Sequence, residues 1–103
     1  MIKVNIKRSN GNINNIRVSG HANYAPSGSD IVCASVSTAM YLSANLLVKV
    51  NKDNEFTEDE KATIMELKIT HNDDMSMIIV DNLLSLLKNL EEDYPKFIKI
   101  KEN

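Results

Sequence analysis

The start of the chain carries the strongest constraint on the fold, a turn signal between two alternating segments. Ile2, Val4 and Ile6 alternate with polar residues, and such alternation is typical of a strand with one buried face. The turn SNGN at residues 9–12 follows, and Asn-Gly is a strong signal for a tight hairpin turn. A second alternating segment occupies residues 13–19. The chain therefore begins with a β-hairpin, and the rest of the sequence has to cover its apolar face.

Residues 31–50 are the first candidate to cover the hairpin, because they have the pattern of an apolar helix. Gly28 breaks the chain before them, and Ser29 or Asp30 is a suitable N-cap. An apolar stripe steps along the segment by three and four residues: Val32, Val36, Ala39, Ser43, Leu46 and Val50. Further apolar residues lie off this stripe: Ile31, Met40, Leu42 and Leu47. We therefore expect the helix to be largely buried, and a second subunit could cover part of it.

The second half of the chain also combines strand and helix patterns. Residues 51–61 are polar and acidic and form either a loop or a short hairpin arm around Phe56. Residues 63–70 alternate and predict a third strand. A second helix follows, with Asp73 or Asp74 as its N-cap.

A proline separates the last two predicted elements. The second helix has an apolar face, and we expect it to end near Asp93 because Pro95 disfavours helix at the residue before it. Residues 97–101 alternate once more and predict a final strand. The order ββαβαβ over residues 1–103 predicts one α+β domain of two layers, with helices packed on a mixed or mostly antiparallel sheet.

Composition argues against several classes of function. The 12 basic and 14 acidic residues give a net charge of −2, which predicts no basic surface for nucleic acid. No apolar run approaches the roughly 18 residues that a membrane helix needs, and the alternating N-terminus is unlike a signal peptide. The single cysteine cannot form an internal disulfide, which fits a reducing compartment. We therefore expect a cytoplasmic protein without direct contacts to nucleic acid or membrane.

Cys33 lies where a helix start can activate a thiol. With Ser29 or Asp30 as the N-cap, the sulfur falls in the first turn, where unpaired N–H groups and the helix dipole favour an anion. Such positions lower the pKa of a thiol from about 8.5 to about 3.5–7.5. His21 directly follows the second strand, and a strand end can present an imidazole rigidly. The pair is therefore a candidate nucleophile and base, with Asp30 capping the helix or orienting the ring.

Simpler interpretations of these residues stay open at this point. A lone cysteine in an apolar helix is most often a small buried side chain, and a lone histidine before a turn is most often solvated. The other histidine, His71, is followed by Asn-Asp-Asp and is interpreted as part of a turn. One cysteine and two distant histidines do not make a closed zinc site, so neither a metal nor another cofactor is expected.

The segment SGHANYAPSGSDIVCASVSTAM, residues 19–40, resembles the ribosomal-processing cysteine protease family, known as Prp. The family pattern is Gly-His-Ala, a short loop, Gly-x-Asp-Ile/Leu-Val-Cys-Ala, then a small residue, an apolar one and Ser. The chain matches this pattern with Gly20, His21, Ala22, Gly28, Asp30, Ile31, Val32, Cys33, Ala34 and Ser37. The opening hairpin, the length and the closing Tyr94-Pro95-x-x-Ile98 are also similar, so the resemblance covers the whole chain, with residues 51–74 matching only in outline.

The resemblance implies a homodimeric cysteine endopeptidase that removes the short N-terminal extension of large-subunit ribosomal protein twenty-seven. Cys33 would be the nucleophile and His21 the general base, and the N–H groups of Val32 or Cys33 would hold the oxyanion. The substrate-binding loop would include Ala22, Asn23, Tyr24, Gly28 and Ser29. Ser37 would line the cleft, or simply pack. Two other functions stay open: a non-catalytic ribosome-assembly factor that binds the same precursor, and a redox-sensing thiol protein.

Overall fold

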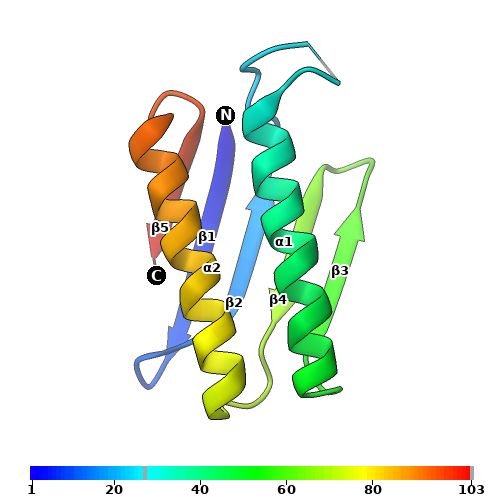
Figure 1. Ribbon diagram of the computed structural model, residues 1–103, viewed down its shortest axis with the longest axis vertical. Helices are drawn as coiled ribbons and strands as arrows, with labels where there is room; N and C mark the ends of the chain where they lie inside the picture. Colours follow the sequence, from blue (N-terminus) through cyan, green and yellow to red (C-terminus); the bar gives the residue numbers. More distant parts are fainter. Residues whose placement is uncertain (27, 103) are drawn as a thin grey trace.

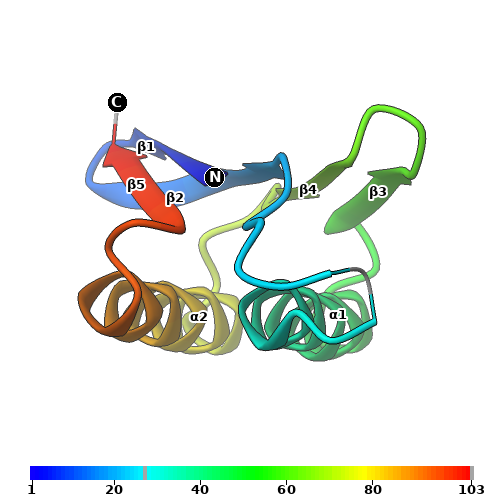
Figure 2. The ribbon, with the colours of Figure 1, turned by 90° about the horizontal axis from the view of Figure 1, so that it is seen from above.

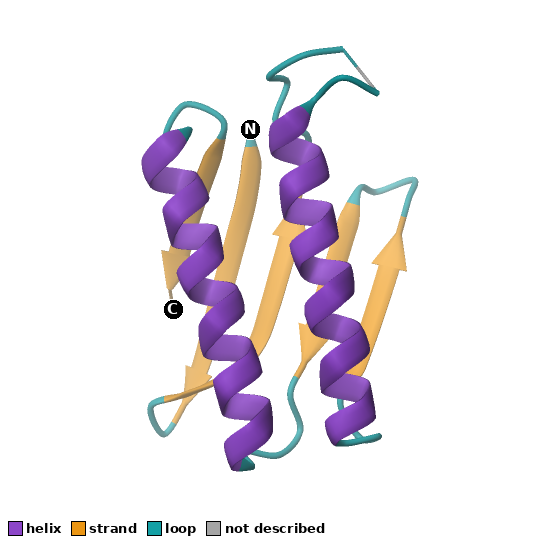
Figure 3. Cartoon of the chain, viewed as in Figure 1, coloured by secondary structure: helices purple, strands orange, loops and turns teal. Residues whose placement is uncertain are grey.

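The computed structural model describes residues 1–26 and 28–102 and contains seven elements of secondary structure. The elements, in chain order, are β1 (Ile2–Ser9), β2 (Asn12–Ser19), α1 (Ile31–Val50), β3 (Glu55–Asp59), β4 (Ile64–Lys68), α2 (Asp74–Asp93) and β5 (Ile98–Glu102) (Figure 1). The two helices lie side by side on the sheet and run roughly along the direction of the strands (Figure 3). Seen from above, both helices form one layer and the sheet forms the other (Figure 2).

The sheet has five strands in the order β3-β4-β2-β1-β5. Three neighbouring pairs are antiparallel, and β1 pairs with β5 in parallel. The two-layer α+β fold with helices on one face of a mixed, mostly antiparallel sheet is therefore confirmed. The parallel pair arises because α2 carries the chain back across the sheet before β5 begins.

The observed order is ββαββαβ, one strand more than the predicted order. The polar segment after α1 is a hairpin arm and not a loop, since β3 pairs with β4 and places Phe56 opposite Leu67. Four of the five residues of β3 are exposed, so the strand lacks the alternation of buried side chains that would have marked it.

The inner face of α1 differs from the predicted stripe. Seven residues are buried: Val32, Val36, Ala39, Met40, Ser43, Ala44 and Leu47. The prediction for Leu46 was wrong, because the stripe continues through Leu47 and leaves Leu46 exposed. The helix is also less buried than expected, with Ile31 50% and Leu42 61% exposed on its outer face.

Helix α1 also corrects the expectation that no segment could span a membrane. By length and composition alone it is apolar enough to cross one. A single helix of this kind is weak evidence for a span, because the core helix of a folded domain passes the same test. Here Val32, Val36 and Met40 are each no more than 2% exposed and belong to the core between the layers.

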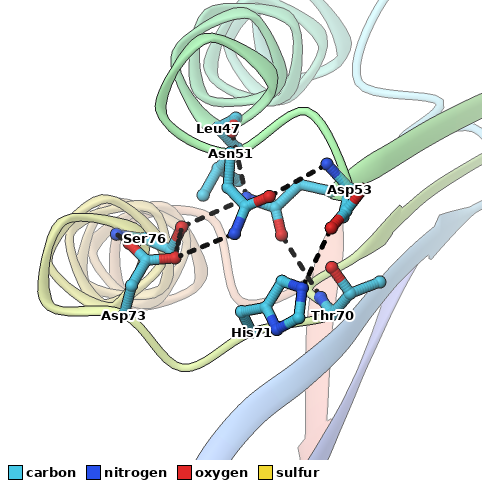
Figure 4. A network of polar contacts seen from close by, with 8 residues as sticks. Leu47, Asn51, Asp53, Thr70, His71, Asp73 and Ser76 are labelled. Carbon is cyan, nitrogen blue, oxygen red and sulfur yellow. Dashed lines mark hydrogen bonds and ion pairs between the residues drawn. The ribbon is translucent and has the colours of Figure 1, made fainter.

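Buried hydrogen bonds join the two helices at the end of the molecule where α1 ends and α2 begins (Figure 4). The side chain of Asn54 is 3% exposed and uses both its amide nitrogen and its oxygen. The nitrogen donates to the Leu47 carbonyl at 3.0 Å and to the Ser76 hydroxyl at 3.1 Å. The oxygen accepts from the Thr70 N–H at 3.2 Å. The side chain of Asn54 therefore links α1, α2 and the segment after β4 through hydrogen bonds.

The same end of the molecule holds His71. Its Nε2 lies 3.0 Å from a carboxylate oxygen of Asp53, and both side chains are more than half exposed. Asp73 is the N-cap of α2 and accepts from the Ser76 N–H at 2.8 Å. The start of α2 lies at the opposite end of the molecule from the start of α1 (Figure 1), so His71 is far from Cys33.

Candidate active site

The backbone that leads into His21 is held from two sides. Gly20 follows β2 with a φ of +86°, a conformation that favours glycine. A Cβ at this position would lie 2.7 Å from the Met1 carbonyl oxygen, so no other residue fits without displacing the chain. On the other side, the Gly20 N–H donates to the Thr63 carbonyl at 3.1 Å. His21 is therefore presented from a fixed point between β1 and β4.

Cys33 lies in the first turn of α1. Of the two N-caps that the sequence allowed, the structure has Asp30, so Cys33 is the third helical residue. One oxygen of Asp30 accepts from the N–H groups of Val32 and Cys33, both at 3.0 Å. These two N–H groups are therefore engaged, and the expectation that they hold the oxyanion does not fit this arrangement.

The second oxygen of Asp30 holds the loop before the helix. It accepts from the N–H groups of Tyr24 at 3.0 Å and Ala25 at 3.4 Å. The hydrogen bond from the Cys33 N–H, with those from the other three backbone groups, holds the pKa of the Asp30 carboxyl below its ordinary value of 3.8, although desolvation raises it. In this structure Asp30 binds backbone donors, and both of its oxygens are directed at them.

The residue after His21 contacts the sulfur. The Ala22 N–H donates to Cys33 Sγ at 3.3 Å, and Ala22 itself is only 2% exposed. Because Ala22 is bonded directly to His21, this contact brings the strand end and the helix start together. Among the hydrogen bonds of residues 1–26 and 28–102, none joins His21 to Cys33 directly; Nε2 of His21 instead lies 3.3 Å from the Thr63 hydroxyl.

The loop between His21 and Cys33 is held in place by an aromatic contact. The ring of Tyr24 packs edge-on against Tyr94 and Phe97 in the connection from α2 to β5, with centroid distances of 5.6 and 5.1 Å. Asn23 has a φ of +58°, and the Ser29 N–H donates to the Pro26 carbonyl at 2.9 Å. Ser27 of this loop lies outside the described residues.

Two pockets share His21 and Cys33 in their linings. The first has a volume of about 240 Å³, with apolar residues from β1, β2, α1 and β4 and an acidic turn at its edge. Besides His21 and Cys33, its lining consists of Ile2, Val18, Gly20, Val36, Ser37, Glu58, Asp59, Glu60, Thr63, Ile64 and Met65. The second, about 390 Å³, is also lined by loop and helix residues: Asn23, Ala25, Gly28, Asp30 and Ala34. Ser37 lines both pockets.

The end of β3 and the turn into β4 were not predicted to belong to the site. Glu58 and Asp59 of β3, with Glu60 and Thr63 of the turn, reach the first pocket through strand pairing that is distant in sequence. Within the described residues, 1–26 and 28–102, no three His, Cys, Asp or Glu side chains are grouped closely enough to hold a metal ion. The thiol of Cys33 and the imidazole of His21 both line the first pocket.

Comparison with known proteins decides the family. A family model described as cysteine protease Prp matches residues 1–99. The chain belongs to this family. It is accordingly a cysteine protease, and the resemblance of residues 19–40 to Prp is confirmed over nearly the whole length.

Relatives of known identity agree with the Prp assignment. The ribosomal processing cysteine protease Prp of Staphylococcus aureus (strain Mu50) is 26% identical over 103 residues, with 97% of each chain covered. The Bacillus subtilis (strain 168) protein of the same name is 23% identical, covering all of this chain and 98% of its own. A crystal structure of S. aureus Prp with a covalently linked product peptide superposes with a TM-score of 0.92 at 25% identity, over the full length of both chains.

Proposed function

We propose that this Prp-family chain is an endopeptidase with Cys33 as nucleophile and His21 as general base. The observation that carries the proposal is the hydrogen bond from the Ala22 N–H to Cys33 Sγ at 3.3 Å. It brings a histidine at a strand end and a cysteine in the first helical turn to one pocket. The thiolate is the nucleophilic form of a cysteine, and a general base within reach of the sulfur can generate it.

The reaction follows from these positions. His21 takes the proton of the thiol, and the Cys33 sulfur forms a bond to the scissile carbonyl carbon. When the carbon–nitrogen bond breaks, His21 gives that proton to the leaving amine, and a thioester remains. Water, deprotonated by His21, then attacks the thioester and releases the acid and the thiol. The Ala22 N–H already points at the reacting sulfur and is the candidate oxyanion donor, since those of Val32 and Cys33 bond to Asp30.

The loop and Ser37 are assigned to substrate binding. Ala22, Asn23, Tyr24, Gly28 and Ser29 belong to one loop, and Asp30 holds this loop through two backbone N–H groups. Asn23 and Gly28 of the loop line the second pocket. Ser37 faces both pockets, where its hydroxyl can bond to a peptide backbone. The apolar lining of the first pocket suits an apolar side chain of the substrate.

The substrate we propose is the N-terminal extension of large-subunit ribosomal protein twenty-seven, and the protein would act in the cytoplasm without nucleic acid, membrane or cofactor. Two relatives are named ribosomal processing proteases, and the S. aureus structure holds a covalently linked product peptide. We also propose a homodimer, because the outer face of α1 exposes Ile31, Leu42 and Leu46 by 44% or more.

A digestion assay of the precursor tests this function. Wild type should cut once and yield the mature protein, whereas Cys33→Ala and His21→Ala should lose nearly all cleavage. His71→Ala is a matched control, because it removes the chain's other histidine at the opposite end of the molecule and should cut like wild type. Tight binding without cleavage by wild type would favour the assembly-factor function. Reversible oxidation of Cys33 in a protein that never cuts would favour the redox-sensing function.

A further inference from the structure

Thr63 has a backbone conformation that its side chain does not favour. Its φ is +56°, in the left-handed region. For a β-branched residue this conformation is an outlier that costs free energy, and such outliers concentrate at functional sites. Asn10 and Asn23, the other residues besides glycine with positive φ among those described, are of a type that tolerates it. A glycine or asparagine would fit position 63 better, so the threonine side chain itself needs an explanation.

The contacts of Thr63 are directed at the strand end that carries His21. Its carbonyl accepts from the Gly20 N–H at 3.1 Å, which extends the pairing of β2 with β4 by one step. Its hydroxyl lies 3.3 Å from Nε2 of His21. The side chain is partly buried and lines the same pocket as Cys33. Two bonds from one residue therefore hold two consecutive residues, the second of which is the proposed base.

We propose that Thr63 is a positioning residue for His21: its hydroxyl accepts from Nε2–H and leaves the unprotonated Nδ1 of the ring to take the thiol proton. A hydroxyl can donate to a ring nitrogen or accept from it, so the placement of the proton on Nε2 is part of the proposal and is what the measurement below tests. In either tautomer the contact at 3.3 Å restricts the rotation of the ring. This inference rests on the proposed role of His21 as general base.

The left-handed conformation is what directs the hydroxyl. The turn of residues 59–63 is closed by a hydrogen bond from the Ala62 N–H to Asp59 at 3.1 Å, and Thr63 is its last residue. The chain then has to enter β4 opposite Ser19. A threonine has few allowed rotamers, so a strained backbone and a stiff side chain together give its hydroxyl a defined position.

Three substitutions separate the hydroxyl from the backbone strain. Thr63→Val keeps the branched shape and loses the hydroxyl, and should lower kcat roughly tenfold with KM little changed, the scale of one lost hydrogen bond. Thr63→Ser keeps the hydroxyl and should restore most of kcat. Thr63→Gly removes both the hydroxyl and the strain, so it should lower kcat like Thr63→Val while raising the thermal midpoint. This last variant keeps the test valid if Thr63→Val folds poorly.

Nitrogen NMR of the His21 ring supplies a readout that does not depend on cleavage. At a pH where the ring is neutral, wild type should show the proton on Nε2, and both Thr63→Val and Thr63→Gly should show a mixture of tautomers. Unchanged tautomers in these variants, or wild-type kcat in either, would overturn the positioning role. A wild-type protein that does not cleave the precursor would instead contradict the proposed function, and the tautomer measurement would still decide the role of Thr63.

Discussion

Replacing Gly20 by alanine tests how the structure positions His21. The added Cβ would lie 2.7 Å from the Met1 carbonyl oxygen, a distance at which backbone atoms have to move. Met1 cannot withdraw freely, because the next residue, Ile2, donates its N–H to the Phe97 carbonyl at 2.8 Å. The substitution should therefore displace the strand end that leads into His21.

The magnitude follows from two separable contributions. A positive φ in a residue with a Cβ costs about 1–2 kcal/mol. Forcing an extra carbon into an occupied place costs a further 1–3 kcal/mol or so. Gly11→Ala is the matched control, because Gly11 has a φ of +83° and nothing within 4 Å of its added Cβ. Gly20→Ala should thus lower the free energy of unfolding by about 2–5 kcal/mol and Gly11→Ala by about 1–2 kcal/mol.

Urea denaturation of both variants measures this difference, with the thermal midpoint as a second reading. Activity on the precursor should fall by roughly 100-fold for Gly20→Ala, because small displacements of a catalytic group have effects of that size, and should stay unchanged for Gly11→Ala. Equal losses of stability in the two variants would refute the close approach to Met1. Full activity of folded Gly20→Ala would refute the argument that this backbone positions His21.

Three further predictions concern stability and titration. Asn54→Ala should lower the free energy of unfolding by about 2–4 kcal/mol in urea, because it removes two buried hydrogen bonds and a partly buried one, and leaves the Thr70 N–H without its partner; a loss within error of zero would contradict this. The hydrogen bond from Tyr41 to Glu58 raises the pKa of the phenol above its ordinary value of 10.0, so one of the three tyrosines should titrate late in an ultraviolet pH titration. Glu58→Gln should shorten this delay because it removes the negative charge beside the phenol, and an unchanged titration would contradict the assigned cause. This bond stabilises the protein below pH 10.0 and is lost as the pH rises through the raised pKa. Asp30 has a lowered pKa, so the destabilisation caused by Asp30→Asn should be full above pH 3.8 and should shrink as the pH falls through the lowered value; a pH-independent difference in thermal midpoint would contradict the assigned cap.

The sequence predicted those parts of the fold whose signals are local. The Asn10-Gly11 turn needs a positive φ at both residues, and their φ values are +54° and +83°. Asp30 and Asp73 are N-caps that the sequence already offered. The sequence could not decide between a loop and a hairpin arm at β3, because an edge strand with exposed side chains has no apolar alternation to identify it. Leu46 was wrongly predicted to be buried. With 3.6 residues per turn, a strict spacing of three and four residues can miss the buried face by one position, and Leu47 is buried in its place.

The candidate site also contains residues with a local sequence signal and residues without one. His21 and Cys33 could be named as candidates because a strand end and a helix start are visible in the sequence. Thr63 could not, because its contact with His21 joins residues 42 positions apart and depends on a backbone angle that threonine disfavours. The two oxygens of Asp30 illustrate a third case: the sequence showed a cap, but only the folded loop shows that its other oxygen holds Tyr24 and Ala25.

The central claim, that Cys33 forms a covalent bond to the substrate with the help of His21, is tested most directly by trapping that bond. Precursor and protein are mixed, quenched with acid within the first turnover, and digested for peptide mapping by mass spectrometry. Wild type should carry the N-terminal fragment of the precursor as a thioester on Cys33, and His21→Ala should carry far less. Cleavage of the precursor at an undiminished rate by Cys33→Ala, with no adduct on the wild-type thiol, would contradict the account.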